Sequence, residues 1–222
     1  MKLSESDLNA CLAPVAVMGG MFDPVHIGHL RSAIEVLEKF KFKELRLIPC
    51  AQPVHRQAAV ASAEHRVTML RYATNWSNKL VVDECEIQRT TPSYTVDTLR
   101  YLKKTTQNSP LCLIVGDDAF HGFPAWHQWQ DLFSLANILV LQRPGVECAL
   151  SDELNAALAG RTCVKHENLR RSPAGKVFFH SVTQLDISST RIRALLSTRQ
   201  NVNYLVPDTV INYIVENKLY RG

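Results

Sequence analysis

Two histidines, His26 and His29, stand three positions apart in the stretch GGMFDPVHIGHL (residues 19–30). Glycines surround them, and the pair Asp23-Pro24 separates them from the first two glycines. Four interpretations of this pattern are open: a metal site, a glycine-rich turn between a strand and a helix, a cradle for phosphate, or a loop next to a helix with no shared function. The rest of the sequence has to decide among them.

The chemistry of the two imidazoles favours an anion. At positions i and i+3 near a helix start they can project to one side, where their N–H groups add to the unpaired backbone donors of the helix. A zinc site would need a third ligand, and no other His or Cys in the chain has supporting spacing. A satisfied loop residue would explain one histidine alone. For the two together the sequence favours phosphate binding and predicts no metal held by the protein.

The glycines indicate where in the fold this anion would bind. Gly19 and Gly20 end a short apolar run, PVAVMGG, where missing side chains let a ligand approach the backbone. Asp23-Pro24 has turn chemistry before the next helix. The spacing is neither Gly-x-x-x-x-Gly-Lys-Ser/Thr nor Gly-x-Gly-x-x-Gly, so the two commonest nucleotide signatures are absent. A phosphate site of another kind stays open.

A second stretch, DISSTRIRALL (residues 186–196), carries similar donors. Ser188 and Ser189 precede a predicted helix in which Arg193 lies one turn from the start. Taken alone, this is an N-capped helix with exposed arginines. Hydroxyl groups and free N–H groups at a helix start, with an arginine one turn in, also make an anion site.

The elements that must position these residues alternate along the chain. Apolar runs predict strands at 14–20, 45–50, 79–87, 111–116 and 137–145. Helical spacing predicts helices at 30–40, 64–74, 94–104 and 126–136. After these come a weak helix at 151–160, a strand at 176–180, and helices at 189–197 and 207–217. This order predicts an α/β fold, a Rossmann-like doubly wound parallel sheet whose ligands bind beyond the carboxyl ends of the strands. We expect one domain over 1–222, with a small helical C-terminal part at about 186–222.

Composition limits the class of protein. Of the 222 residues 46% are hydrophobic and 21% charged, which is typical of globular proteins. No stretch reads as a secretory signal or a membrane span, so we expect a cytoplasmic protein without a membrane partner. Six cysteines without Cys-x-x-Cys spacing are expected to be buried and reduced. The net charge of +4 is weak evidence for an acidic partner. A basic cluster at 161–171 lacks interleaved aromatics, so no nucleic-acid partner is predicted.

With both anion stretches noted, the chain resembles the nucleotidyltransferase superfamily marked by His-x-Gly-His and a distal Ser-Ser/Thr-x-x-Arg segment. Within it the resemblance is to the bacterial nicotinate-mononucleotide adenylyltransferases. Their pattern Gly-Gly-Thr/Ser-Phe-Asp-Pro-x-His-x-Gly-His appears here as GGMFDPVHIGH, and Ile-Ser-x-Thr-x-Ile-Arg appears as ISSTRIR. PSYTVDTL, GDD, FPAW and RPG occur in that family's order, so the resemblance covers nearly the whole chain.

The resemblance implies an adenylyltransferase of NAD biosynthesis. Its substrates would be ATP and nicotinate mononucleotide, its products nicotinate adenine dinucleotide and pyrophosphate, and its cofactor Mg²⁺ bound mainly through ATP. The implied catalytic residues are His26, His29 and Arg193. The implied ATP-binding residues are Gly19, Gly20, Met21, Phe22, Arg56, Asp118, Ser188 and Ser189. The residues implied to hold the mononucleotide are Thr95, Trp126 and His127.

Three departures from the family pattern bear on these roles. Met21 replaces a small hydroxyl residue, which removes a polar contact. The loop QPVHR, which contains Arg56, has one proline where relatives often have two. His127 stands where another aromatic residue is common beside the tryptophan. Oligomeric state is not predicted.

Two rival functions keep the ATP site. One is a transferase that uses another phosphorylated acceptor, such as phosphopantetheine, glycerol phosphate or nicotinamide mononucleotide, and the other is a nucleotide-binding sensor without catalysis. PSYTVDTL and FPAW favour the nicotinate reaction over the first. Against the second, His26, His29, Ser188 and Arg193 are all present, so nothing in the sequence suggests lost activity. We also expect Trp126 to begin the 126–136 helix, whose first N–H groups would then face the pyridine ring and favour a carboxylate over an amide.

Overall fold

The computed structural model describes residues 13–51, 53, 58–106, 109–142, 149–183 and 185–221. Three of the predicted features lie outside these ranges. They are Arg56, the last part of the predicted strand at 143–145, and two of the six cysteines, Cys11 and Cys148.

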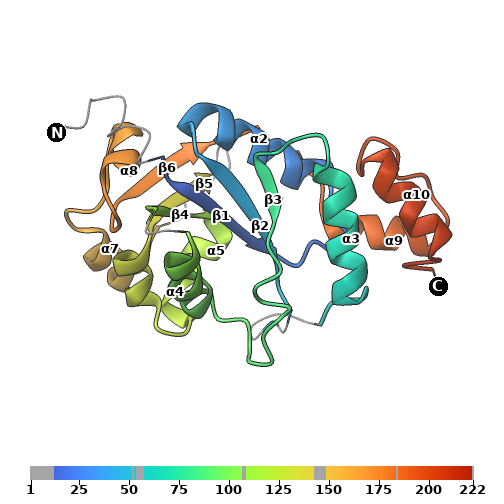
Figure 1. The fold of residues 1–222 in the computed structure, drawn as a ribbon, viewed down its shortest axis with the longest axis horizontal. Coiled ribbons are helices and arrows are strands. Elements are labelled where there is room, and N and C mark those ends of the chain that lie inside the picture. The colour runs from blue at the N-terminus through green and yellow to red at the C-terminus, as the bar shows by residue number, and fades with distance from the viewer. Residues whose placement is uncertain are drawn as a thin grey trace. The chain divides into compact units, whose positions relative to one another are not determined.

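The described residues form one six-stranded sheet in the order β3-β2-β1-β4-β5-β6 (Figure 1). The strands are β1 (Val15–Gly20), β2 (Glu44–Pro49), β3 (Leu80–Val82), β4 (Leu111–Gly116), β5 (Asn137–Gln142) and β6 (Val177–Ser181). β1 pairs with β4, β4 with β5 and β5 with β6, each in parallel. Most of these strand residues are buried, as expected of parallel strands that helices cover. The predicted α/β fold is confirmed.

The helices follow the strands in the alternation that the sequence predicts. They are α2 (Ile27–Phe40), α3 (Ala63–Thr74), α4 (Thr95–Thr105), α5 (Asp117–His121), α6 (Leu132–Leu135), α7 (Asp152–Leu158), α8 (Glu167–Arg171), α9 (Ser189–Ser197) and α10 (Asp208–Glu216). The short helices α5 and α8 were not predicted, and α2 begins at Ile27, earlier than predicted. In the described ranges no helix combines the length and apolar character needed to cross a membrane.

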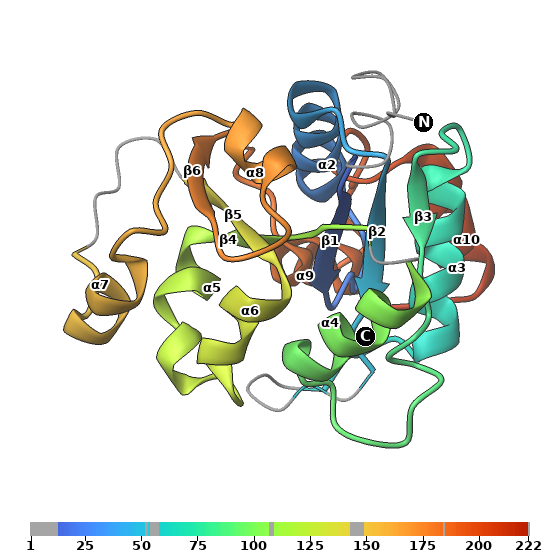
Figure 2. The same ribbon diagram turned by 60° about the vertical axis from the view of Figure 1, so that its left-hand side comes forward.

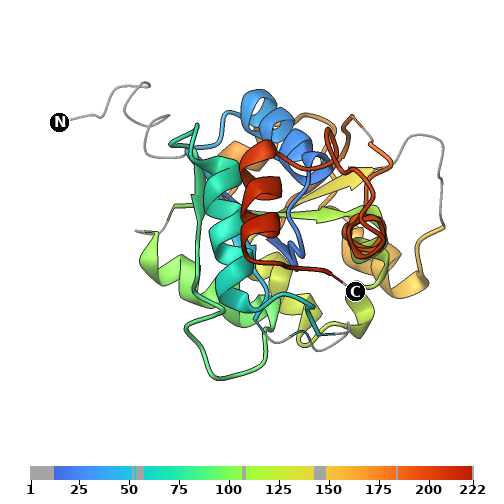
Figure 3. The same ribbon diagram turned by 90° about the vertical axis from the view of Figure 1, so that its right-hand side faces the viewer.

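The chain forms two compact units. The first consists of Met1–Met18, Leu37–Leu45 and Tyr94–Val182, and the second of Gly19–Val36, Arg46–Ser93 and Thr183–Gly222. In the first unit α4 packs against α6, and α5 against β4 and β5 (Figure 2). In the second unit α3 and α10 lie side by side (Figure 3). The expectation of one domain over 1–222 stays a prediction.

The predicted helix at 126–136 is wrong over most of its length. Two 3₁₀ turns, Phe123–Ala125 and Trp129–Asp131, precede α6. Trp126 is extended, with φ −81° and ψ 145°, and Gln128 is left-handed with φ 51°. Turns of about three residues repeat apolar side chains at nearly the spacing of an α-helix. The apolar residues of this segment therefore show nearly helical spacing although the segment is not a continuous helix.

The predicted strand at 79–87 is also too long, because only Leu80–Val82 is a strand. The carboxylate of Asp83 accepts a hydrogen bond from the N–H of Cys85 at 3.0 Å. Such a local side-chain bond turns the backbone away from strand pairing. The apolar residues beyond it lie in a turn.

Candidate functional site

His26 ends the turn between β1 and α2, and His29 lies in the first turn of α2. The two side chains face each other in the second unit. Their rings stack with centroids 3.6 Å apart and an interplanar angle of 26°. The N–H of His26 donates to Nδ1 of His29 at 3.3 Å, and the N–H of His29 donates to Nδ1 of His26 at 3.4 Å. Because each Nδ1 accepts, the hydrogen of each neutral imidazole must be on Nε2. We call these two residues the histidine pair, and it presents two N–H donors.

The histidine pair is uncharged at neutral pH. Burial lowers the pKa of His26 to about 4. Burial, and then the neighbouring His26, lower the pKa of His29 well below its usual value. Both rings therefore act as neutral hydrogen-bond donors in the free protein, which suits the binding of an anion without a proton transfer.

The buried His26 should make the stability of the protein depend on pH. Its pKa is about 4 in the folded state and about 6.5 when unfolded, so the unfolded chain binds the extra proton first. The free energy of unfolding should fall as pH falls from about 6.5 to about 4, by about 3 kcal/mol from this residue. Urea unfolding across this range should show the loss in the parent and a smaller loss in His26→Gln. An equal pH dependence in both proteins would contradict the assignment. His166→Gln, in the first unit, is the control.

Glycines shape the backbone around the histidine pair. A Cβ at Gly28 would lie 3.1 Å from the His26 ring, and one at Gly20 would lie 3.0 Å from the Phe22 ring. A Cβ at Gly19 would meet no atom within 4 Å, so there is open space beside this residue. A side chain at position 28 would therefore press on the His26 ring, and Gly19 leaves room for a ligand at the backbone.

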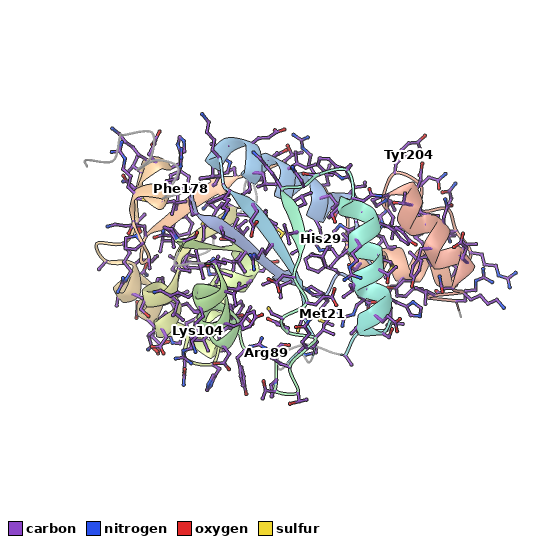
Figure 4. All side chains as sticks on the ribbon, in the orientation of Figure 1. Met21, His29, Arg89, Lys104, Phe178 and Tyr204 are labelled. Atoms are coloured by element: carbon purple, nitrogen blue, oxygen red, sulfur yellow. The ribbon has the colours of Figure 1, made fainter. Side chains whose placement is uncertain are left out.

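Two other residues predicted to bind ATP lie against this turn. The Phe22 ring, which is 1% exposed, packs edge-on against His29 with centroids 5.1 Å apart. The carbonyl of Met21 accepts a hydrogen bond from Nη1 of Arg66, on α3, at 2.8 Å. Figure 4 shows Met21 and His29 on the same side of α3. Phe22 thus supports a ring of the histidine pair, and Met21 is held through its backbone.

The start of α9 is bonded to the turn that precedes the histidine pair. The Ser188 hydroxyl caps α9 by accepting the N–H of Arg191 at 3.2 Å, as the sequence predicts for an N-cap. Ser189 donates its hydroxyl to the Pro24 carbonyl at 2.9 Å. Arg193 donates from Nη1 to the Asp23 carbonyl at 2.8 Å. The two stretches singled out in the sequence are therefore in direct contact.

The sequence reasoning missed the residues that organise this contact. Asp23, read only as a turn residue, is 3% exposed, and its carboxylate accepts hydrogen bonds from Val60 and Ala61 N–H at 2.7 and 3.1 Å. It also accepts the hydroxyl of Tyr220 at 2.7 Å. Arg66 is 1% exposed, and burial lowers its pKa while the charge of Asp23 opposes that shift. The sequence signal for Arg66 was an arginine among the mostly apolar residues of the buried face of α3.

The residues predicted to hold the mononucleotide lie in the first unit. Thr95 is the first residue of α4, and the preceding Tyr94 makes no side-chain cap. The Tyr94 ring lies 4.3 Å from that of His127, between centroids, and the Trp126 ring lies 4.8 Å from that of Phe123. The start of α4 and the turn at 126–127 therefore lie close together. The helix start expected at Trp126 is absent, so donors from a helix end are available at Thr95 instead.

The predictions for Asp118, the cysteines and a metal site concern other parts of the structure. Asp118 is exposed on α5, immediately after β4, with a partner of its own. Cys85, Cys112 and Cys163 are buried and Cys50 is half-buried, and all four are free thiols. Among the residues that the structure describes, no group of three or more His, Cys, Asp or Glu side chains is arranged to hold a metal ion.

The sequence matches known proteins over nearly its full length. A family model described as cytidylyltransferase-like matches residues 17–195. A protein of Hahella chejuensis named "Probable nicotinate-nucleotide adenylyltransferase" is 43% identical over 210 residues, which cover 94% of this chain and 96% of that protein. A protein of Methylococcus capsulatus with the same name is 44% identical over 207 residues, which cover 93% and 99%.

The fold also matches solved structures. Nicotinic acid mononucleotide adenylyltransferase of Plasmodium falciparum complexed with NaAD aligns with a TM-score of 0.71 and 17% identity. The alignment covers 93% of this chain and 97% of that one. The same enzyme complexed with APC gives a TM-score of 0.70 at 17% identity. At this identity the likeness concerns the fold alone.

Proposed function

The chain belongs to the nicotinate-nucleotide adenylyltransferase family, and from this we propose that it transfers the adenylyl group of ATP to nicotinate mononucleotide through the histidine pair. The products are nicotinate adenine dinucleotide and pyrophosphate. The single observation that carries the residue assignment is the neutral histidine pair, whose Nε2–H groups are fixed by reciprocal hydrogen bonds beside α9. Such a site provides donors for phosphate oxygens and needs no change of protonation.

The reaction requires little covalent chemistry from the protein. A phosphate oxygen of the mononucleotide attacks the α-phosphorus of ATP, the new O–P bond forms, and the bond from that phosphorus to pyrophosphate breaks. The nucleophile is already an anion, so neither a general base nor an enzyme nucleophile is needed. Alignment of the two substrates and stabilisation of the charge on the leaving pyrophosphate then supply the rate.

The second unit provides the donors for that charge. The open space beside Gly19 lets phosphate oxygens reach backbone N–H groups. The histidine pair donates two N–H groups, and Arg193 adds a guanidinium that can bind two oxygens at once. Ser188 caps α9, and Ser189 holds the start of this helix against the same turn. Fixed donors of this kind require no rearrangement as charge develops.

Mg²⁺ is proposed to enter on ATP. The carboxylate of Asp23, three residues before His26, already accepts hydrogen bonds from two N–H groups and one hydroxyl. Its oxygens are therefore poorly placed to bind an ion as well, and triphosphate oxygens and water are the ligands that fit Mg²⁺ here. When bound, the ion would neutralise part of the charge on the leaving group.

The first unit is proposed to recognise the pyridine ring. Trp126 offers an aromatic face, and Thr95 and His127 offer donors beside the start of α4. Asp118 is proposed to contact the nucleotide ribose, and Arg56, outside the described residues, the triphosphate. A cytoplasmic location is proposed as well, because the free thiols suit a reducing compartment.

These donors should make the enzyme prefer the acid to the amide. The start of α4 and a donor from His127 or Thr95 stabilise a carboxylate more than a neutral amide. We expect kcat/KM for nicotinate mononucleotide to exceed that for nicotinamide mononucleotide by at least about ten-fold, the smaller value for a charge-assisted hydrogen bond. Initial rates for both substrates at fixed ATP and Mg²⁺ measure the ratio. Equal values would contradict the proposed donors.

A panel of acceptors tests the function as a whole. The purified chain is incubated with ATP, Mg²⁺ and either nicotinate mononucleotide, nicotinamide mononucleotide, phosphopantetheine or glycerol phosphate, and pyrophosphate is measured. We expect the fastest release with nicotinate mononucleotide. Release only with phosphopantetheine or glycerol phosphate would indicate a different transferase. Binding of ATP without release for any acceptor would indicate a nucleotide sensor.

A further inference from the structure

The carboxylate of Asp23 is the centre of a buried cluster that includes Tyr220, which follows α10. Its Oδ1 accepts the Tyr220 hydroxyl at 2.7 Å and the Ala61 N–H at 3.1 Å, and its Oδ2 accepts the Val60 N–H at 2.7 Å. Arg193 Nη1 lies 3.8 Å from Oδ2. We call these residues the Asp23 cluster. It holds the turn that leads directly into the histidine pair.

Arg193 contributes both hydrogen bonds and a positive charge to this cluster. It donates to the Asp23 carbonyl at 2.8 Å and to the Thr190 hydroxyl at 3.4 Å, and its charge lies near the Asp23 carboxylate. A phosphate bound at the same guanidinium would compete for that charge. A buried carboxylate that loses part of a cationic partner is costly unless other donors hold it.

Tyr220 reaches the cluster through an unfavourable backbone conformation. Its backbone is left-handed with φ 58°, and so is that of Lys218 with φ 54°. Such values are unfavourable for residues other than glycine and persist where the surrounding contacts require them. The Tyr220 side chain is 8% exposed. Burial and the hydrogen bond to Asp23 raise the pKa of Tyr220, so its hydroxyl remains a donor throughout the working pH range.

We propose that Tyr220 is a positioning residue for ATP binding: its hydroxyl holds the Asp23 carboxylate, and with it the histidine turn, when Arg193 engages phosphate. The proposal rests on the proposed function of Arg193 and the histidine pair. Tyr220 itself touches no substrate. Its hydrogen bond keeps the turn in one position while the cation is shared between two anions.

The test is Tyr220→Phe, which removes only the hydroxyl. We expect KM for ATP to rise about ten-fold, the value of one hydrogen bond to a charged acceptor, while KM for nicotinate mononucleotide stays within about two-fold. The matched control is Tyr213→Phe. The Tyr213 hydroxyl bonds to Nδ1 of His65 at 2.8 Å in the same unit, rather than to Asp23. This control should leave both constants close to the parent values.

A double-mutant cycle separates positioning from general packing. If Tyr220 acts by holding Asp23 while Arg193 turns to phosphate, Tyr220→Phe should cost much less in an Arg193→Lys background than in the parent. Additive effects would overturn the proposal, and so would an unchanged KM for ATP in Tyr220→Phe, or an equal loss in Tyr213→Phe.

ATP binding by calorimetry provides a readout independent of the acceptor. At low temperature, where a destabilised variant stays folded, Tyr220→Phe should bind ATP about ten-fold more weakly than the parent. Equal affinity would overturn the positioning role. A parent protein that binds ATP but releases no pyrophosphate with nicotinate mononucleotide would instead overturn the proposed function, and the calorimetric comparison would still decide the role of Tyr220.

Discussion

His29→Ala should lower kcat by about 10²–10³-fold, the range for loss of one preorganised donor to a developing anion. The KM for nicotinate mononucleotide should change little, because the lost N–H acts on charge that grows at the phosphates as pyrophosphate leaves. The ring is neutral in the free protein, so its hydrogen is available as a donor at neutral pH. Steady-state rates with saturating substrates measure the effect.

The control for this variant is His65→Ala. His65 lies in the same unit, on α3, where its ring bonds to the Tyr213 hydroxyl. We expect its kcat to stay near that of the parent. Urea unfolding of both variants checks that the fold survives the loss of the ring that stacks on His26. A folded His29→Ala protein with the kcat of the parent would contradict the role of the histidine pair.

Arg193→Lys should lower kcat/KM for ATP by about 10²-fold, because a small displacement of the reacting groups has an effect of that order. An ammonium cannot reproduce the planar fork of the guanidinium, which here bonds to the Asp23 carbonyl and the Thr190 hydroxyl and is proposed to bind phosphate as well. The substitution therefore has two effects: it removes a phosphate contact, and it weakens the bond that holds the turn at Asp23. Rates at varied ATP measure the loss.

Arg191→Lys is the matched control on the same helix. The Arg191 side chain is 65% exposed and lies 3.9 Å from the carboxylate of Asp186, an exposed pair of small energetic value. We expect this variant to keep the activity of the parent. If Arg193→Lys also kept full activity at every ATP concentration, Arg193 would be a surface residue without a role in the reaction.

The local parts of the site could be predicted from the sequence. Residues 19–30 carry their own turn chemistry and helix start, and the serines before α9 carry their own cap, so nearby spacing was enough to identify both. The contact between these two stretches could only be inferred from family resemblance. It depends on Arg193 reaching a carbonyl at Asp23, far away in the chain.

The Asp23 cluster could not be predicted in the same way. The donors to one carboxylate come from Val60, Ala61 and Tyr220, and no local pattern links these positions. The helix expected at Trp126 failed for a different reason, because a series of short turns repeats apolar residues at nearly the helical spacing. We therefore assign the N–H donors for the carboxylate of nicotinate mononucleotide to the start of α4 instead.

Isotope transfer tests the central claim most directly, namely that the adenylyl group passes straight from ATP to the mononucleotide on a site of fixed hydrogen-bond donors. The protein is mixed with ATP labelled at the α-phosphorus, first without and then with nicotinate mononucleotide, and the label is followed in protein and dinucleotide. A parallel reaction holds unlabelled ATP and labelled pyrophosphate, and its label is followed in ATP. Direct transfer predicts no labelled protein and no exchange of pyrophosphate into ATP without the mononucleotide, and label in the dinucleotide once it is added. Labelled protein, or pyrophosphate exchange without the mononucleotide, would contradict direct transfer and require an enzyme nucleophile.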